Sequence, residues 1–406
     1  MTGVTWPTPA AASLLHDLTD QLVAVLPDAV ALRQELHRTP DLGGYEGPTA
    51  ARLRQALPGL PATPVASTGF ITRIGPDGPS IGIRAELDAL PIIEQTGSPW
   101  ASATPRAMHA CGHDVHMAGA WALLQAARRL PELPAGMLGV FQPREEMQPS
   151  GGADIAASGL LEQHDLRAMI GVHVQPRLPL GVVSAGSGGV NAAADEFDIV
   201  IHGEPGHGAY PHIAIDPIPI LATIVLGLQE LIGRTIDPIR PALITVGEIR
   251  AGASHNVIPA SGSLHGIIRT MHDEDQAHLH VAIRRLAEHT AQARGARAEV
   301  RIVTGDPVLA NDARLAQLAE PLLGGAGLLP AFEHFRSLGA DDFSHYARLA
   351  PSLMIFVGAG QAATHGARHE IGLHHPEFLP DDAAVAEVAT AFAAGYVAAA
   401  HLAGAL

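Results

Sequence analysis

The residues best suited to chemistry stand in the segment Met108-His-Ala-Cys-Gly-His-Asp-Val-His116. Cys111 and His113 are separated by one glycine, which allows a tight turn between them. A thiolate and an imidazole that meet in a loop suit a borderline-soft ion such as zinc. Asp114 could cap the following helix or orient a ligand, and His116 is expected to support the site rather than to bind metal. Two alternatives stay open for Cys111: a nucleophile beside a histidine, or a small buried apolar residue.

Further polar residues follow three apolar stretches that are typical of strands. They are Glu86 and Asp88 after Ile81–Ala85, Glu145 and Glu146 after Met137–Phe141, and His173 after Met169–Val172. Open α/β sheets bind ligands beyond the carboxyl ends of their strands, so these side chains are expected at one rim. A strand end near solvent is also polar without any function, so the whole set argues more strongly than any single residue.

Glu145 and Glu146 are adjacent, and adjacent side chains of an extended chain point to opposite sides. We therefore expect them to have different roles. One can bind a metal ion while the other takes a proton from an activated water, as metal-assisted hydrolysis requires. The alternative is a solvated acidic pair, which the preceding buried strand disfavours.

Several later residues have little meaning from spacing alone. His374 and His375 are adjacent near the C-terminus, and His207 lies in a glycine-rich turn. Asn256 lies close to a proline, and Arg269 ends a strand-like run. Without further information these are loop histidines, a turn asparagine and a surface arginine.

The elements that must position these residues form an α/β pattern. Helical spacing predicts helices over Val23–Leu36, Thr49–Leu57 and Val115–Leu130. Short runs that are apolar on both faces predict buried parallel strands at Phe70–Ile74, Ile81–Leu87, Met137–Phe141, Met169–Val174 and Leu353–Val357. We therefore predict a mostly parallel sheet flanked by helices, formed by residues 1–190 and 305–406.

Residues 191–304 show a different pattern. Strands are predicted at 196–202, 242–249, 263–269 and 298–303, with helices at 216–234 and 273–294. The order β-α-β-β-α-β is that of a ferredoxin-like unit. We predict that this segment is an inserted domain that serves as a lid or for dimerisation.

Composition excludes several classes of protein. The chain has 406 residues and a formal charge of −16, which argues against nucleic-acid binding. A single cysteine excludes an internal disulfide. The N-terminus lacks the pattern of a signal peptide, and apolar stretches such as Ile218–Leu228 look too short to span a bilayer. A cytoplasmic location is expected.

Eleven short motifs, in order along nearly the whole chain, resemble one known family. The chain is similar to the amidohydrolase branch of the aminoacylase and hippurate-hydrolase metallopeptidases, which includes the indoleacetyl-amino-acid hydrolases. The motifs are Glu35-Leu-His-Arg-Thr-Pro, Arg84-Ala-Glu-Leu-Asp-Ala-Leu-Pro, Met108-His-Ala-Cys-Gly-His-Asp, Phe141-Gln-Pro-Arg-Glu-Glu, Gly151-Gly-Ala, Gly171-Val-His-Val, Gly206-His-Gly-Ala-Tyr-Pro-His, Asn256-Val-Ile-Pro, Gly266-Ile-Ile-Arg, Asp341-Asp-Phe-Ser and Leu373-His-His-Pro-Glu-Phe.

The resemblance implies two divalent metal ions per subunit, with zinc expected and manganese or cobalt as alternatives. The implied ligands are Cys111, His113, Glu146, His173 and His374. Glu145 would be the general base and Asp88 an orienting carboxylate. His207 would reach the active site of a partner subunit in a homodimer, and Asn256 and Arg269 would hold the substrate.

The implied reaction is hydrolysis of the amide bond of an N-acyl amino acid. A dipeptidase or carboxypeptidase on the same scaffold, a metal- or ligand-binding protein without turnover, and a cysteine hydrolase are the alternatives. Three positions depart from the family pattern: Glu86 replaces Asp, Arg144 replaces Ala, and His375 replaces a small residue. The cation at Arg144 could alter the neighbouring carboxylates or reach the substrate.

Overall fold

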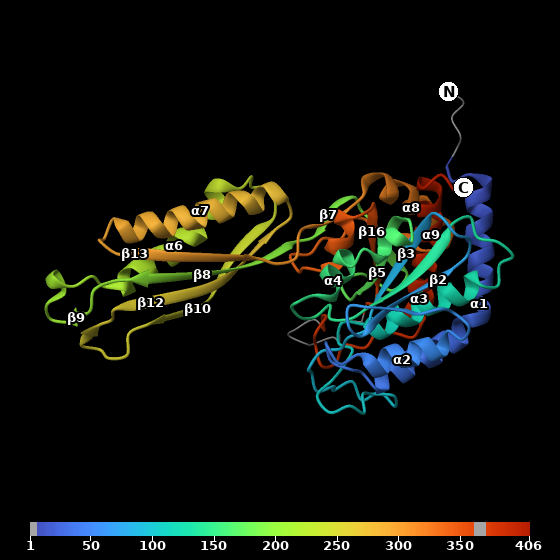
Figure 1. The fold of residues 1–406 in the computed structure, drawn as a ribbon, viewed down its shortest axis with the longest axis horizontal. Coiled ribbons are helices and arrows are strands. Elements are labelled where there is room, and N and C mark those ends of the chain that lie inside the picture. The colour runs from blue at the N-terminus through green and yellow to red at the C-terminus, as the bar shows by residue number, and fades with distance from the viewer. Residues whose placement is uncertain (1–5, 361–370) are drawn as a thin grey trace, which may run out of the picture. The chain divides into compact units, whose positions relative to one another are not determined.

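The computed structural model describes residues 6–360 and 371–406, which form two compact units (Figure 1). Unit 1 contains the chain up to Gly188, Ala310–Phe335 and Asp342–Leu406; unit 2 contains Gly189–Leu309 and Arg336–Asp341. Residues 1–5, part of the segment examined for a signal peptide, lie outside the described residues. The short strands β7 (Gly188–Asn191) and β14 (Leu309–Asn311) stand where the chain passes between units.

An eight-stranded sheet forms the centre of unit 1. Its strands, in spatial order, are β1 (Thr63–Val65), β2 (Gly69–Ile74), β4 (Gly136–Gln142), β3 (Ser80–Glu86), β5 (Leu166–Gln175), β16 (Ser352–Gly358), β6 (Val182–Ser184) and β15 (Leu329–Pro330). Strands β4, β3, β5 and β16 are parallel, which confirms the predicted mostly parallel α/β sheet. The prediction of a parallel strand over Phe70–Ile74 is wrong, because β2 runs antiparallel to β4. Burial on both faces makes a strand apolar whatever its direction.

Helices cover both faces of this sheet. They are α1 (Pro9–Arg38), α2 (Gly47–Ala56), α3 (His113–Ala127), α4 (Gly151–Ala157), α5 (Leu160–Gln163), α8 (Ala313–Gly325) and α9 (Ala383–Leu402), with a 3₁₀ segment η2 (Asp342–Arg348). Ile170 of β5 packs against Gly395 of α9, whereas the next residue, Gly171, faces Phe343 of η2. Because successive residues of a strand face opposite ways, α9 and η2 lie on opposite faces.

Helix α1 begins well before the predicted Val23. The Thr8 side chain accepts a hydrogen bond from the backbone N–H of Ala11, and Pro9 occupies the first helical position. Both features are favourable helix starts. Pro27 lies inside this helix and does not end it.

Unit 2 is built on a four-stranded antiparallel sheet in the order β10 (Ala242–Ala251), β12 (Ser261–Thr270), β8 (Ala193–His202), β13 (Arg297–Thr304). Helices α6 (Pro217–Thr235) and α7 (Asp273–Gln292) cover one face, and the remaining elements are β9 (Gly206–His207), η1 (Pro211–Ile213) and β11 (Val257–Ile258). Burial alternates along β8, where Phe197 and Ile199 face the helices and Asp198 faces away. The main elements follow the order strand, helix, strand, strand, helix, strand. Service as a lid or for dimerisation stays a prediction.

Two helices, α6 and α9, are long and apolar enough to span a membrane by length and composition alone. Most of α9 is buried in the core of unit 1, where an apolar helix is expected. In unit 2, α6 buries Ile224 and Leu228 and leaves Leu226 68% exposed. The apolar stretch at 218–228 is part of this 19-residue helix. The prediction that it is too short to span a bilayer is wrong as a statement about length and composition.

Candidate metal centre

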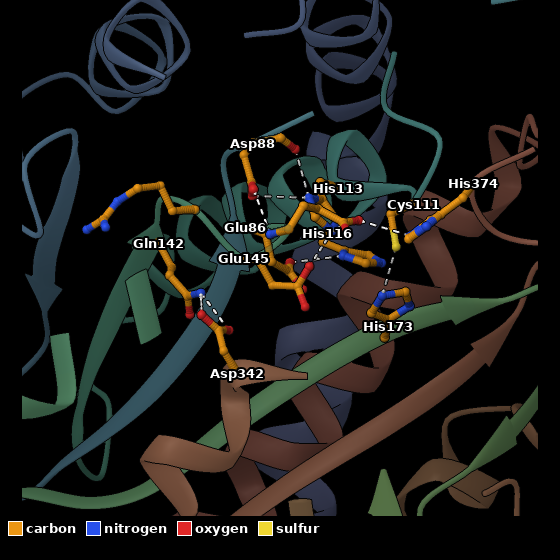
Figure 2. Close-up of polar contacts among 12 residues, drawn as sticks. Glu86, Asp88, Cys111, His113, His116, Gln142, Glu145, His173, Asp342 and His374 are labelled. Atoms are coloured by element: carbon orange, nitrogen blue, oxygen red, sulfur yellow. Dashed lines mark hydrogen bonds and ion pairs between the residues drawn. The ribbon is translucent and has the colours of Figure 1, made fainter. Parts of the chain in front are cut away.

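Seven of the predicted site residues come together in unit 1, beyond the carboxyl ends of its parallel strands. They are Asp88, Cys111, His113, Glu145, Glu146, His173 and His374. Figure 2 shows Cys111, His173 and His374 close together beside His113. Asp88, Glu145, Glu146 and His173 follow or end separate strands and meet at one rim, as expected from the sequence.

Gly112 makes the turn that places Cys111 and His113 at the start of α3. Its φ of 84° is left-handed, and it is the N-cap of the helix. A Cβ here would lie 2.3 Å from a methyl carbon of Val174, so both conformation and space require glycine.

Hydrogen bonds to backbone carbonyls orient two of the histidines. Nδ1 of His113 donates to the carbonyl of Asp88 at 2.8 Å, and Nδ1 of His173 donates to the carbonyl of Val174 at 2.8 Å. A carbonyl only accepts, so each Nε2 is left to face the cluster. Nε2 of His173 lies 3.5 Å from Sγ of Cys111.

Glu145 and Glu146 face the same centre. Nε2 of His113 lies 3.7 Å from Oε2 of Glu145 and 4.0 Å from Oε1 of Glu146. The premise of an extended chain is wrong here: Arg144 has a left-handed φ of 51°, and residues 145–149 form a bend. Adjacent side chains can therefore converge. Each of the two also belongs to another donor group: Glu146 to one with Cys111 and His374, and Glu145 to one that includes Asp342.

The two groups that matter for the predicted ligands are His113 with Glu145 and Glu146, and Cys111 with Glu146 and His374. Within each group the ligand atoms lie within 4.8 Å of one another. Nε2 of His374 is 3.1 Å from Oε1 of Glu146. By contrast, Nδ1 of His375 accepts from the backbone N–H of Glu377 at 3.2 Å, so this ring is turned into its own loop. The geometry therefore favours His374 over His375.

The carboxylates at the centre favour a positive charge there, as the pKa values of the neighbouring groups indicate. Burial lowers the pKa of His113, but Glu86, Asp88 and Glu146 outweigh it and raise that pKa to about 10. Burial raises the pKa of the Cys111 thiol well above its usual range, and the charges of Glu146 and Glu145 raise it further. Burial and the charge of His116 lower the pKa of His173 to about 3.

The donors present fit divalent metal ions. Nε2 of His113 is buried without a hydrogen-bond partner among the described residues. Such an orphaned atom is costly unless something binds it. Thiol sulfur, imidazole nitrogen and carboxylate oxygen together form a set suited to zinc and similar ions.

A buried polar network lies behind the centre. The sequence analysis expects Glu86 and His116 near the site, but it misses the contributions of Arg84 and Asp342. Nδ1 of His116 donates to Oε2 of Glu86 at 3.0 Å, and its Nε2 accepts from the backbone N–H of Val174 at 2.9 Å. His116 thus has no ring nitrogen left for a metal. Arg84 forms an ion pair with Glu86 and donates to Oδ1 of Asp342 at 2.7 Å. The signal was present: Arg84 and Glu86 alternate with apolar residues along a buried strand.

Arg144 does not point its charge at the neighbouring glutamates. Its guanidinium donates to the carbonyl of Pro149 at 2.6 Å and pairs with Asp154. The side chain is therefore held along its own loop, and the departure from the family pattern at this position directs the charge of Arg144 to Asp154.

The remaining predicted residues lie in unit 2. His207 of β9 pairs with Val257 of β11, and the N–H of Gly208 donates to the carbonyl of Asn256 at 2.8 Å. Figure 1 shows β9 beyond one end of the four-stranded sheet. Arg269 lies at the other end of β12, roughly 25 Å along the strand at about 3.3 Å per residue. A single copy therefore does not bring Arg269 and Asn256 onto one small substrate, and their joint role in holding it stays a prediction.

Comparison with known proteins agrees with this chemistry. The model of "Peptidase family M20/M25/M40" matches residues 82–390. N-acetylcysteine deacetylase of Bacillus subtilis is 34% identical over 372 residues, covering 90% of this chain and 94% of that protein. N-acetyldiaminopimelate deacetylase of Exiguobacterium sibiricum is 32% identical over 366 residues, covering 88% and 95%. A crystal structure of a dinuclear metal-binding M20 peptidase from Bacillus subtilis superposes with a TM-score of 0.80 at 32% identity, covering 92% and 98%.

Proposed function

Because the chain belongs to peptidase family M20/M25/M40, we propose that it hydrolyses the amide bond of N-acyl amino acids and releases a carboxylic acid and a free amino acid. Membership confirms the family resemblance seen in the motifs. The observation that carries the proposal is the convergence of a thiol, three imidazoles and two carboxylates, with Nε2 of His113 buried and unpartnered among the described residues.

Two divalent ions are expected at this centre, held by Cys111, His113, Glu146, His173 and His374. Zinc is the first choice for this donor set, with manganese or cobalt as alternatives. When bound, such ions polarise the acyl carbonyl and lower the pKa of a water. Glu146 shares one donor group with His113 and another with Cys111 and His374, which supports its assignment as a ligand.

Glu145 is proposed to take the proton from the attacking water and to pass it to the leaving amine. Its carboxylate is close to His113 but, unlike Glu146, is not in the group with Cys111 and His374. Asp88 is proposed to orient this arrangement. Its Oδ2 accepts the backbone N–H of Glu146 at 2.9 Å, and its own carbonyl fixes the ring of His113.

A homodimer is proposed to complete the site. His207, which would stabilise the oxyanion, is exposed on the β9–β11 ribbon with Asn256, at the end of unit 2 opposite Arg269. Two copies can supply the ribbon and the arginine to one substrate, whereas the sheet of one copy separates them. Nη1 of Arg269 is buried without a hydrogen-bond partner among the described residues, as a receptor for the substrate carboxylate would be.

The surface proposed for dimerisation is the groove between α6 and the edge strand β10. Leu226 of α6 is 68% exposed and Ile249 of β10 is 53% exposed. An exposed apolar helix face beside an unpaired strand edge suits two-fold pairing with a second copy. A cytoplasmic location, and the lack of nucleic-acid and membrane partners, remain expectations from composition.

A cysteine hydrolase is disfavoured by the environment of Cys111. A nucleophilic cysteine needs a lowered thiol pKa, and here burial and two carboxylates raise it. Alkylation of a nucleophile would abolish activity without any metal requirement, so the two mechanisms differ in their response to a chelator.

The proposed function is tested by a substrate panel. N-acyl amino acids from acetyl to aromatic and long-chain would be offered to the metal-loaded enzyme, beside dipeptides with a free α-amino group, and the released amino acid measured. We expect release from acyl amino acids at least about 10-fold faster, in kcat/KM, than from dipeptides. Faster cleavage of dipeptides would identify a dipeptidase instead, and no release from any member would contradict the proposal.

A further inference from the structure

A buried carboxylate outside the donor cluster holds the loop that carries the two glutamates. Glu46 precedes α2 and is fully buried. Its Oε1 accepts from the backbone N–H of Gly44 at 2.8 Å and from the backbone N–H of Arg144 at 2.9 Å. Its Oε2 accepts from the hydroxyl of Thr68 at 2.7 Å. It therefore ties three separate segments of unit 1 together.

The bond to Arg144 is made at the residue where the loop turns. Arg144 has a left-handed φ of 51°, which favours glycine, and it stands directly before Glu145. Two residues later, the backbone N–H of Glu146 donates to Oδ2 of Asp88 at 2.9 Å. The main chain is thus fixed by a carboxylate on each side of Glu145.

In the described part of the chain, the buried carboxylate of Glu46 is held by hydrogen bonds alone. Within residues 6–360 and 371–406, the partners of the Glu46 carboxylate are two N–H groups and one hydroxyl, and none is a cation. Burying a charge without an opposite charge is costly. Hydrogen bonds from backbone N–H groups to a charged acceptor are stronger than those to a neutral one, so the carboxylate holds the loop more firmly than an apolar residue could.

We propose that Glu46 is a positioning residue that acts through the main chain of Arg144 to aim Glu145 and Glu146 at the metal centre. The inference rests on the proposed function, since Glu145 matters as the base of that reaction. A base displaced by about 1 Å can cost about 100-fold in rate, so a lost anchor at Arg144 should appear in kcat.

The test compares Glu46→Ala with Asp41→Ala. Asp41 lies in the same loop, and its carboxylate accepts from the N–H and hydroxyl of Thr49 at 2.9 and 2.6 Å without touching residues 143–147. With an N-acyl amino acid, Glu46→Ala should lower kcat by about 30- to 100-fold with KM within about 3-fold, and Asp41→Ala should change kcat by no more than about 2-fold. Equal kcat values for the two variants would overturn the proposal.

Two conservative variants keep the test decisive if Glu46→Ala does not fold. Glu46→Gln retains an oxygen acceptor at the same reach, and Glu46→Asp retains the charge on a shorter stem. Positioning through Arg144 predicts that Gln stays within about 5-fold of the original kcat and that Asp loses about 10-fold or more. If Asp kept more activity than Gln, the reach of Glu46 to the N–H of Arg144 would not explain its effect, and the proposal would be wrong.

A readout that does not depend on turnover separates this inference from the proposed function. Amide hydrogen exchange over residues 144–147 should be at least about 10-fold faster in Glu46→Ala than in Asp41→Ala. Inactivity of the unaltered enzyme on every acyl amino acid would refute the proposed function, whereas faster exchange would still support the anchor. Unchanged exchange in Glu46→Ala would refute the anchor even in an active enzyme.

Discussion

Glu145 and Glu146 differ by one position, yet their contacts divide the work between them. Both glutamates share a donor group with His113, but only Glu146 shares one with Cys111. Glu145→Gln should keep bound metal and lower kcat by about 100-fold or more, as expected for a lost general base. Glu146→Gln should lower metal affinity by about 10-fold or more. Metal content by mass spectrometry and initial rates would be measured together.

The exposed Glu132→Gln provides a matched control for both variants, because it makes the same chemical change away from the centre. It should leave metal content and kcat unchanged. If Glu145→Gln instead lost the metal and Glu146→Gln kept it, the two roles would have to be exchanged.

At the scale of elements, a buried ionic chain joins α1 to the start of α3. Nδ1 of His37 lies 3.0 Å from Oδ2 of Asp114, and its Nε2 lies 3.3 Å from Oε1 of Glu94. Burial lowers the pKa of His37, but Asp114 and Glu94 outweigh it and raise that pKa to about 9. A folded pKa above the unfolded value of 6.5 stabilises the fold below about pH 6.5, and this stabilisation is lost as pH rises through 9.

The expected loss is about 3 kcal/mol in the free energy of unfolding between pH 6.5 and 9.5, from a pKa difference of about 2.5 units. Urea unfolding of the protein and of His37→Asn at both pH values measures it. The variant should lose much less stability over this interval. The same loss in both proteins would show that His37 is not the titrating group.

The elements could be predicted from sequence where burial alone decides. β3, β4, β5 and β16 are buried throughout, so their apolar runs identify them. The direction of β2 could not be predicted, because burial does not encode direction. The bend at Arg144 was also invisible, since a non-glycine residue with positive φ leaves no pattern. The anchor at Glu46 could not be predicted either, because its hydrogen bond joins residues that are 98 positions apart in the sequence.

The donor residues themselves were predictable because short motifs contain them, and the structure brings the predicted set in unit 1 together. The unit 2 residues show the limit of that reasoning. Motifs specify His207, Asn256 and Arg269 but not their separation, which depends on the register of β12 and on the ribbon beyond it. Only the folded sheet reveals that one copy cannot join them.

At the scale of the whole molecule, this separation predicts shared active sites in a homodimer. His207→Ala and Glu145→Ala proteins should each be nearly inactive. Mixed subunits should recover activity, because one site in each heterodimer then combines an intact Glu145 with the partner subunit's His207. Activity after subunit exchange, followed by mass spectrometry of the mixed dimer, measures this. No recovery despite proven exchange would show that His207 does not act across the dimer.

The most direct test of the central claim is a titration of metal-free protein with zinc while the release of free amino acid from an N-acetyl amino acid is followed. Without metal, His113 holds a proton and no ion activates the attacking water, so activity should be absent. Because metal replaces protons on these ligands, activity should return with added ion and reach its maximum near two equivalents per chain. Full hydrolysis by the metal-free protein would contradict the account.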